Sequence, residues 1–207
     1  SYKKPPNLHR ADEYISLLEQ FTGKKITERL VNLHAKTTEH NYNQVVLNFN
    51  SEAISRRMPI DKGKRLISSL TNAFKNTKFI LVGSPKEKEY IDELLNGVEN
   101  SEQVENCAGK TSLEGLCQLM ASSKAILTTD SGPAHLANSL NVPTIVLFGA
   151  GNEFNTAPYN KQFLRVIRAG QLECEPCVRN TCKLYGIPKC MQLIDELEII
   201  NALSLYL

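Results

Sequence analysis

The chain has 207 residues, of which 42% are hydrophobic and 22% charged, as is typical of a soluble globular protein with a substantial core. Its 24 basic and 22 acidic side chains leave a net charge of +2, which argues against a general nucleic-acid-binding surface. No apolar run approaches membrane-spanning length, and no signal peptide opens the sequence. The first residue is serine and not methionine, so we expect a processed chain or a piece of a longer one.

In chain order, a basic linker with prolines (1–10) comes first, and a short amphipathic helix follows it and stops at Gly23. Short apolar segments then alternate with longer helical patterns. The expected strands are 44–50, 78–83, 104–108, 125–127, 144–149 and 163–167. The expected helices are 11–21, 59–74, 86–95, 112–121 and a helix that begins near residue 132.

This alternation predicts βαβ units and a parallel sheet, since parallel strands need crossover connections. Several strands are almost continuously apolar, as burial on both faces requires. We therefore predict an α/β fold with a Rossmann-like parallel sheet and helices on both faces. Residues 1–43 would form a linker and lead-in helix, and residues 44–207 the α/β domain with a cysteine-containing carboxyl-terminal loop and helix. Ligands of such sheets bind beyond the carboxyl ends of the strands.

One strand-turn-helix junction stands at such an end. Thr129-Asp130-Ser131-Gly132-Pro133 follows an apolar strand and precedes an Ala/Leu-rich helical pattern. Gly132 allows close backbone approach to a ligand, and Asp130 or Ser131 can cap the helix. The first turn of a helix offers free N–H groups and a positive dipole end, which suits a phosphate. An ordinary capped junction is the alternative interpretation.

Polar segments follow the other strands as well. Arg56 and Arg57 precede a helix opened by proline and can pair with a diphosphate, although a solvent-facing basic loop would look the same. Glu87 stands in the first turn after the second strand, where a carboxylate can accept hydrogen bonds from ribose hydroxyls or simply complement the helix dipole. In the loop 109–115, Thr111 or Ser112 can cap the next helix, and the residues before the cap can line a base pocket.

Together these segments resemble the carboxyl-terminal domain of glycosyltransferase family 9, the lipopolysaccharide heptosyltransferases, which have the two-domain GT-B fold. The resemblance runs from about residue 44 to 194. The matching segments are 56–59, 83–87, 109–113, 129–135, 148–149, 157–159 and the cysteine segment 174–191. Two departures from the family pattern are Met58, where the family often has tryptophan, and the loop 150–155, so the resemblance does not assign the sugar preference.

The resemblance implies a donor-binding domain for a nucleotide diphosphate sugar of the ADP-heptose type, with no cofactor. It assigns substrate-binding roles at eight positions. Arg56 would bind phosphate, Glu87 ribose, and Lys110 and Thr111 the adenine side of the nucleotide. Asp130, Ser131 and Gly132 would bind the diphosphate and the sugar, and His135 stands at the position of a histidine found in the family. A histidine inside a helix is otherwise usually a packed structural residue.

The same resemblance implies an inverting displacement whose general base belongs to an amino-terminal domain that has no room in this chain. No catalytic residue is assigned, and we expect the fragment to be inactive alone. The implied partners are a nucleotide diphosphate sugar and, through the missing domain, a lipopolysaccharide core acceptor. The implied location is cytoplasmic, with association at the inner face of the bacterial inner membrane left open. A transferase that uses a UDP-sugar and a non-catalytic nucleotide-binding module are the alternatives.

Six cysteines need separate consideration. Cys107 and Cys117 lie in apolar patterns and are interpreted as small buried hydrophobic residues. The spacing Cys174-x2-Cys177-x4-Cys182-x7-Cys190 could hold zinc, as in a zinc-stabilised interaction domain, or form disulfides, which a bacterial cytoplasm disfavours. The family carries these cysteines without a recognised metal role, so no metal is assigned.

Overall fold

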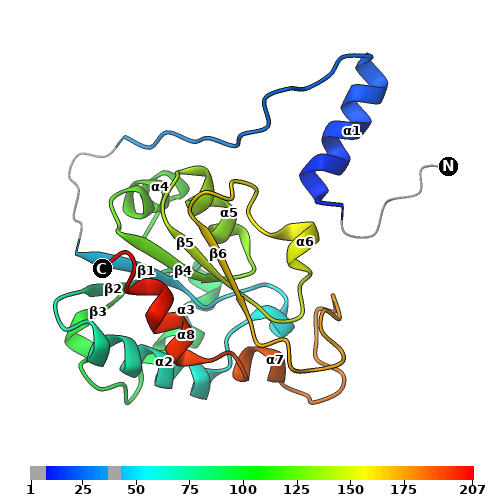
Figure 1. Cartoon of the computed structure of the whole chain (residues 1–207). Coiled ribbons are helices and arrows are strands. Elements are labelled where there is room, and N and C mark those ends of the chain that lie inside the picture. The colour runs from blue at the N-terminus through cyan, green and yellow to red at the C-terminus, as the bar shows by residue number, and fades with distance from the viewer. Residues whose placement is uncertain (1–7, 37–42) are drawn as a thin grey trace.

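The protein is built on a six-stranded parallel sheet in the order β3-β2-β1-β4-β5-β6. The computed structural model describes residues 8–36 and 43–207 (Figure 1). Its strands are β1 (Gln44–Asn48), β2 (Lys78–Leu81), β3 (Val104–Asn106), β4 (Ala125–Thr129), β5 (Thr144–Phe148) and β6 (Leu164–Arg168). The strand order reverses between β1 and β4, which is the switch point where ligands of doubly wound sheets bind.

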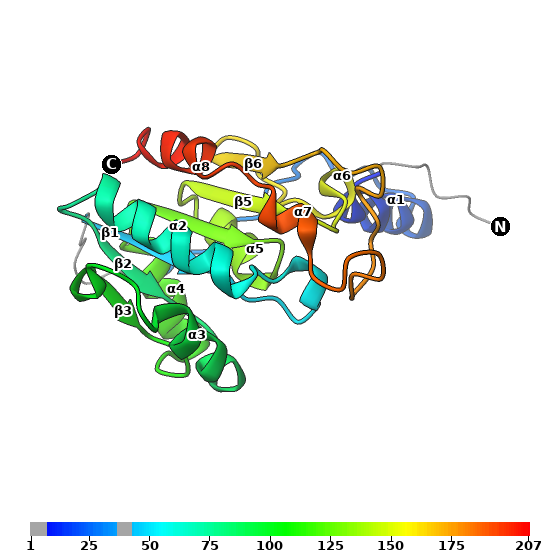
Figure 2. The ribbon, with the colours of Figure 1, turned by 90° about the horizontal axis from the view of Figure 1, so that it is seen from below.

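Helices cover both faces of this sheet. The helices of the described residues are α1 (Arg10–Thr22), which projects from the sheet domain, and α2 (Ile60–Ala73), α3 (Lys88–Leu95), α4 (Leu113–Ala121), α5 (Gly132–Ser139), α6 (Glu153–Thr156), α7 (Lys189–Gln192) and α8 (Glu196–Leu203), with 3-10 turns η1 (Ile54–Arg56), η2 (Pro85–Glu87) and η3 (Ser101–Gln103). Figures 1 and 2 show α2 and α8 side by side on one face, with α4 and α5 on the other. The Rossmann-like α/β prediction is confirmed.

The apolar strand residues separate by face, because successive side chains of a strand point in opposite directions. Val45 and Leu47 of β1 belong to the large core under α2, α3 and α8. Val46, between them, belongs to the smaller core under α4 and α5. The strands are therefore buried on both sides, which explains their continuous apolar sequence.

Differences from the predicted elements are confined to their ends. β1, β2, β3 and β5 stop one or two residues early, while β4 continues through Thr129 and so carries the sheet up to the polar turn. The helix expected from Lys86 begins with the 3-10 turn η2 and becomes α-helical at Lys88. Of the expected linker 1–10, residues 1–7 lie outside the described residues, and Arg10 already belongs to α1.

The two isolated cysteines are less buried than predicted. Cys107 and Cys117 are both half-buried. The Cys107 thiol lies 3.3 Å from Glu105 Oε1, and burial with this carboxylate raises its pKa to about 11. Cys107 packs against the smaller core, so its interpretation as a small hydrophobic residue is confirmed in part, whereas Cys117 is half-buried and is not among the residues of these cores.

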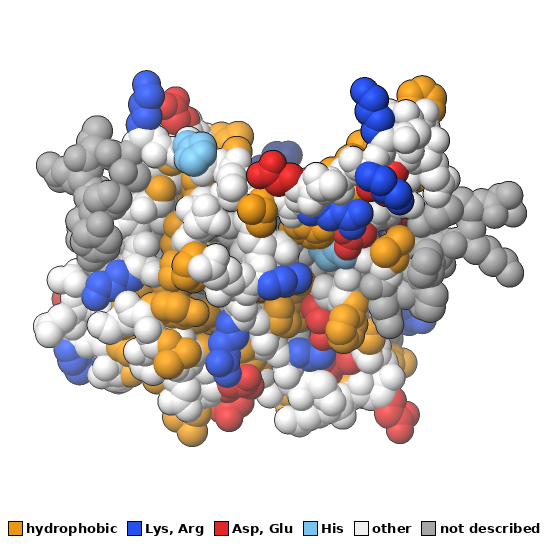
Figure 3. Space-filling view, turned by 45° about the horizontal axis from the view of Figure 1, so that its top comes forward, with side chains coloured by type: hydrophobic (Ala, Val, Ile, Leu, Met, Phe, Trp, Pro, Cys, Tyr) orange, Lys and Arg blue, Asp and Glu red, His pale blue; other side chains and the backbone are white. Residues whose placement is uncertain are grey.

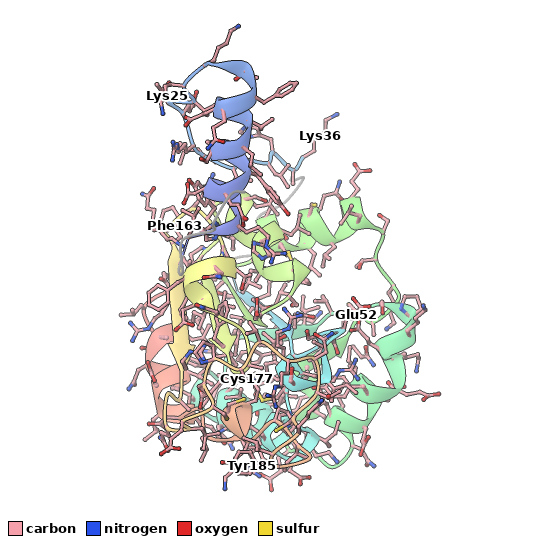
Figure 4. The ribbon with its side chains drawn as sticks, turned by 90° about the vertical axis from the view of Figure 1, so that its right-hand side faces the viewer. Lys25, Lys36, Glu52, Phe163, Cys177 and Tyr185 are labelled. Carbon is pink, nitrogen blue, oxygen red and sulfur yellow. The ribbon has the colours of Figure 1, made fainter. Side chains whose placement is uncertain are left out.

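The amino-terminal helix α1 differs from every other long helix, since it buries none of its residues. It ends at Gly23 in the left-handed conformation (φ 68°), as predicted. Its apolar residues are exposed: Tyr14 is 58%, Leu18 53% and Phe21 90% exposed. Figure 4 shows α1 projecting from the sheet domain, with Lys25 beside its far end.

The near end of α1 is attached to the sheet domain by polar contacts. His9 Nε2 lies 2.7 Å from the carbonyl oxygen of Ala157, and the Tyr159 hydroxyl donates to Asp12 at 2.6 Å. Farther along, the backbone of Val31 exchanges two hydrogen bonds with the Asn160 amide, of 3.2 and 2.7 Å. These contacts place segment 8–36 beside the carboxyl ends of β4 and β5.

Candidate functional site

Two adjoining cavities lie along the carboxyl ends of the strands. The first, of about 460 Å³, lies near β2 and is called the β2 cavity; its walls include Asn50, Gly83 and Glu87. The second, of about 520 Å³, lies under α1 and is called the α1 cavity; its walls include Tyr14 and His135. Both are lined by Ser51, Glu52, Ser131 and Gly132, so they form one continuous cleft at the switch point.

The start of α5 stands where the two cavities meet. Ser131 occupies the N-cap position, but no side chain caps the helix. The Ser131 hydroxyl instead donates to Thr129 O at 3.1 Å and accepts from Asn48 Nδ2 at 2.9 Å. A Cβ added to Gly132 would meet nothing within 4 Å, so the backbone there faces open space. Pro133 has no N–H and Ala134 N donates to Ser131 O at 3.1 Å, so this helix start offers an anion the N–H of Gly132 and the positive end of the helix dipole.

A buried polar network fixes this junction to the sheet. Asn48, at the end of β1, donates to Thr128 Oγ1 at 3.0 Å across the switch point. Asn50 donates through Nδ2 to Val82 O at 2.7 Å and to Asn48 Oδ1 at 3.2 Å. Asn50 is 3% exposed, and its Oδ1 is buried without a hydrogen-bond partner beside the β2 cavity. This amide oxygen can accept a hydrogen bond from a bound molecule or a water. Sequence reasoning assigned Asn50 no role, although a polar residue directly after a buried strand was a usable signal.

Asp130 and Arg56, both predicted ligands, form an ion pair with Arg56 Nη1 3.3 Å from Asp130 Oδ2. The Asp130 side chain is 4% exposed and that of Arg56 33%. Burial raises the pKa of Asp130 above its ordinary value, and the charge of Arg56 opposes this shift. Arg56 lines the α1 cavity and is not among the residues that line the β2 cavity. Its guanidinium is therefore placed toward the α1 side of the α5 start.

The turn after β5 packs against Asp130. A Cβ on Gly151 would lie only 2.1 Å from Asp130 Oδ2, so only glycine fits here. Arg168 secures this turn through hydrogen bonds to the carbonyl oxygens of Gly149 and Gly151. It also pairs with Glu153 at 2.6 Å and with Glu175 at 3.2 Å. Sequence reasoning missed Arg168, which positions the turn and is not itself a wall of either cavity.

Glu87 has a structural role and also lines the β2 cavity. Its Oε2 accepts a hydrogen bond of 2.8 Å from the backbone N–H of Ser84 and so completes a capping box at η2. The interpretation of Glu87 as an acid at a helix start is thus confirmed. Its other carboxylate oxygen, Oε1, has no hydrogen bond within the described residues and can serve the cavity that Glu87 lines. A contact with ribose stays a prediction.

The loop 109–115 contributes one of its two predicted ligands to the cleft. Thr111 lines the β2 cavity together with Ser112 and Leu113. Ser112 is the cap of α4, since its hydroxyl accepts from Gly115 N at 3.1 Å. Lys110 is exposed and does not line either cavity, so its adenine-side role has no geometric support here.

His135 lies one turn into α5 and lines the α1 cavity. It is exposed to this cavity, so the interpretation as a packed structural histidine is wrong. Partial desolvation lowers its pKa and the Asp130 carboxylate raises it, with desolvation the stronger effect. A neutral imidazole can donate or accept a hydrogen bond with a bound hydroxyl.

Cys174, Cys177 and Cys182 lie in the loop before α7, in which Figure 4 labels Cys177, and Cys190 lies in α7 itself. Cys174, Cys177 and Cys182 are half-buried around a separate cavity of about 280 Å³, and Cys190 is buried. All four are free thiols, and burial raises the pKa of Cys190 to about 11. Within residues 8–36 and 43–207, no three His, Cys, Asp or Glu side chains are arranged to hold a metal ion.

Comparison with known proteins gives the family. The model of glycosyltransferase family 9 (heptosyltransferase) matches residues 1–187, which is most of the chain. The chain belongs to glycosyltransferase family 9. A lipooligosaccharide heptosyltransferase 2 of Campylobacter jejuni is 28% identical over 135 residues, 64% of this chain and 42% of that protein. A lipopolysaccharide heptosyltransferase 1 of Pseudomonas aeruginosa is 32% identical over 113 residues, 55% of this chain and 30% of that protein.

Solved structures agree on the fold of this family 9 chain. A glycosyltransferase family 9 structure from Veillonella parvula has a TM-score of 0.76 at 20% identity, covering 100% of this chain and 62% of that one. The Escherichia coli ADP-heptose heptosyltransferase II has a TM-score of 0.65 at 23% identity, and the match covers 94% of this chain and 51% of that one. The chain thus spans about half the length of these relatives. Among the described residues, no helix is long and apolar enough to cross a membrane.

Proposed function

We propose that this family 9 chain is the donor-binding domain of a heptosyltransferase and binds a nucleotide diphosphate sugar of the ADP-heptose type. The observation that carries the proposal is the uncapped start of α5, which opens at the meeting point of two cavities on the switch point of the sheet. A diphosphate placed there would have the nucleoside on one side and the sugar on the other.

The β2 cavity suits the nucleoside. Asn50 offers a buried amide oxygen without a partner, Glu87 a carboxylate and Thr111 a hydroxyl, all from the walls of this cavity. Acceptors of this kind match ribose hydroxyls and the exocyclic amine of a base. A structure of the Escherichia coli heptosyltransferase WaaC with ADP has a TM-score of 0.62 to this chain and covers 80% of it, which supports ADP as the nucleotide.

The α1 cavity suits the sugar, with Asp130, His135 and Tyr159 among its polar walls. When the glycosidic bond to the diphosphate breaks, negative charge develops on the leaving oxygen at the start of α5. The N–H of Gly132, the positive end of the α5 dipole and the Arg56 guanidinium would stabilise this charge, as pre-organised donors do in other enzymes. We place the general base that deprotonates the acceptor, and the lipopolysaccharide core acceptor itself, on the part of the family relatives that this chain does not span.

Thermal unfolding with nucleotides tests the proposal. ADP at 100 times its dissociation constant should add about 2.7 kcal/mol to the free energy of unfolding and raise the melting temperature. Arg56→Ala should weaken this response, whereas Arg65→Ala, which removes an arginine that is 59% exposed on α2, should leave it unchanged. Parallel scans with UDP and GDP distinguish a UDP-sugar transferase. No shift with any of the three at millimolar concentration would exclude a donor site.

A further inference from the structure

A third cavity, of about 200 Å³, adjoins the cleft and is called the arginine cavity. Its walls include Arg10 from the start of α1, Arg56 from η1 and Arg179 from the cysteine loop. It shares Arg10, Arg56, Asp130 and Thr156 with the α1 cavity, and no residue with the β2 cavity. Along the cleft, the arginine cavity therefore lies beyond the α1 cavity and away from the nucleoside end.

The walls of this cavity carry an excess of positive charge. Asp130 is the one acidic residue among them, and it is already paired with Arg56. Arg10 and Arg179 are exposed, and neither side chain has an ion pair or hydrogen bond within the described part of the chain. Two guanidinium groups are thus available at one small cavity. Lys and Arg side chains also gather around the projecting α1 segment, as Figure 3 shows.

The backbone around these arginines is held in place. Ser55, next to Arg56, donates from its hydroxyl to Arg179 O and from its N–H to Asn180 O at 3.0 Å. Val178 N donates to Ala150 O at 2.8 Å, which ties the same loop to the turn that Arg168 secures. On the other side, His9 fixes the start of α1 through its contact with Ala157. Three segments distant in sequence therefore present arginines to one point.

We propose that the arginine cavity binds an anionic group of the acceptor, a carboxylate or a phosphate. Arginine is the side chain best matched to such groups, because its planar guanidinium can donate two parallel hydrogen bonds. The assignment to the acceptor rests on the proposed function, in which Arg56 serves the leaving diphosphate and the sugar fills the α1 cavity. Arg10 and Arg179 are then left for a second anion next to the sugar, where an attacking molecule would be held.

Inorganic phosphate is the probe that tests this site, titrated into the protein with and without saturating ADP and followed by backbone amide shifts. Phosphate should bind the ADP-saturated protein, with shifts at residues 178–180. Arg179→Gln should weaken this binding about ten- to a hundredfold, because it removes a charged hydrogen-bond donor. The affinity of the Arg179→Gln variant for ADP should differ from that of the wild type by less than about twofold. The matched control is Arg165→Gln, which removes an arginine of similar exposure on β6 and should change neither affinity.

Each outcome of this titration has a definite meaning. Loss of phosphate binding on saturation with ADP would show a single anion site and overturn the proposal, as would an Arg179→Gln variant that binds phosphate like the wild type. If ADP fails to bind but phosphate binding depends on Arg179, the anion site stands and the proposed function falls. A parallel titration with glucuronate distinguishes a carboxylate ligand from a phosphate ligand by which of the two binds more tightly.

Discussion

The two walls of the α1 cavity are built in opposite ways. One wall belongs to the sheet domain, where Asp130 and Ser131 are joined to β1 and η1 by an ion pair and buried hydrogen bonds. The other wall comes from α1, which buries no residue and exposes Phe21 and Leu18. The difference indicates that one side of the α1 cavity is pre-organised by the sheet, while the other side is formed by a helix whose apolar residues are exposed.

The largest effect expected from this contrast concerns catalysis. A cleft with one rigid wall and no assigned base should hold a nucleotide without transferring the sugar, so the purified 207-residue chain should show only background transfer and hydrolysis. Positioned general bases contribute about 10²- to 10⁴-fold to rates, and fusion to the amino-terminal half of a family 9 relative should restore at least that factor. Release of ADP from ADP-heptose is the measurement. Robust turnover by the chain alone would direct attention to Glu52, Glu87, Asp130 and His135.

Stability should also separate the two walls. Leu66 is fully buried under the sheet, so replacing it with alanine should lower the free energy of unfolding by about 2–5 kcal/mol. Leu17 of α1 is 43% exposed, and the same replacement should stay within about 0.5 kcal/mol. Urea denaturation measures both. Equal losses would mean that α1 packs more closely in solution than the structure shows.

A substitution of Glu87 tests the β2 cavity specifically. Glu87→Gln should weaken ADP binding by roughly 1–3 kcal/mol if a carboxylate oxygen accepts from ribose. The unfolding free energy should change by well under about 1 kcal/mol, as for other first-turn acids. Glu89→Gln, an exposed first-turn acid of α3 outside the cavities, is the control. If stability falls and calorimetric affinity for ADP does not, the capping box is the whole role of Glu87.

The smallest expected effect is the pH dependence at Asp130. Its raised pKa means that the folded state binds this proton more tightly than the unfolded state does. The contribution of Asp130 to stability is therefore greatest below the ordinary carboxyl pKa and declines as the pH rises through the folded-state pKa. Asp130→Asn should remove that decline from melting curves recorded between about pH 3 and pH 7. Arg56→Ala should move it to higher pH, since the opposing cation is lost. A D130N curve parallel to the wild type would contradict the assignment.

Much of the sheet-domain wall could be predicted from sequence, because local patterns determine it. The apolar runs indicated each strand, and Ser131-Gly132-Pro133 marked the helix start at the correct residue. The Arg56–Asp130 pair was not predictable, because it joins residues 74 positions apart that only the folded chain brings together. The same holds for Arg168 and Asn50, whose importance depends on which carbonyl groups and cavities surround them. The apolar spacing of α1 correctly gave a helix but not its exposure, since periodicity does not say what covers a face.

The most direct test of the central claim is a map of ADP binding onto individual backbone amides by NMR titration. Binding at the cleft should shift the amide of Gly132 most strongly, with smaller shifts at 83–87 and 111–113 around the β2 cavity. The exposed face of α1, including Leu18 and Phe21, should not respond. Shifts confined to α1 or to the cysteine loop, with Gly132 unchanged under saturating ADP, would contradict a donor site at the start of α5.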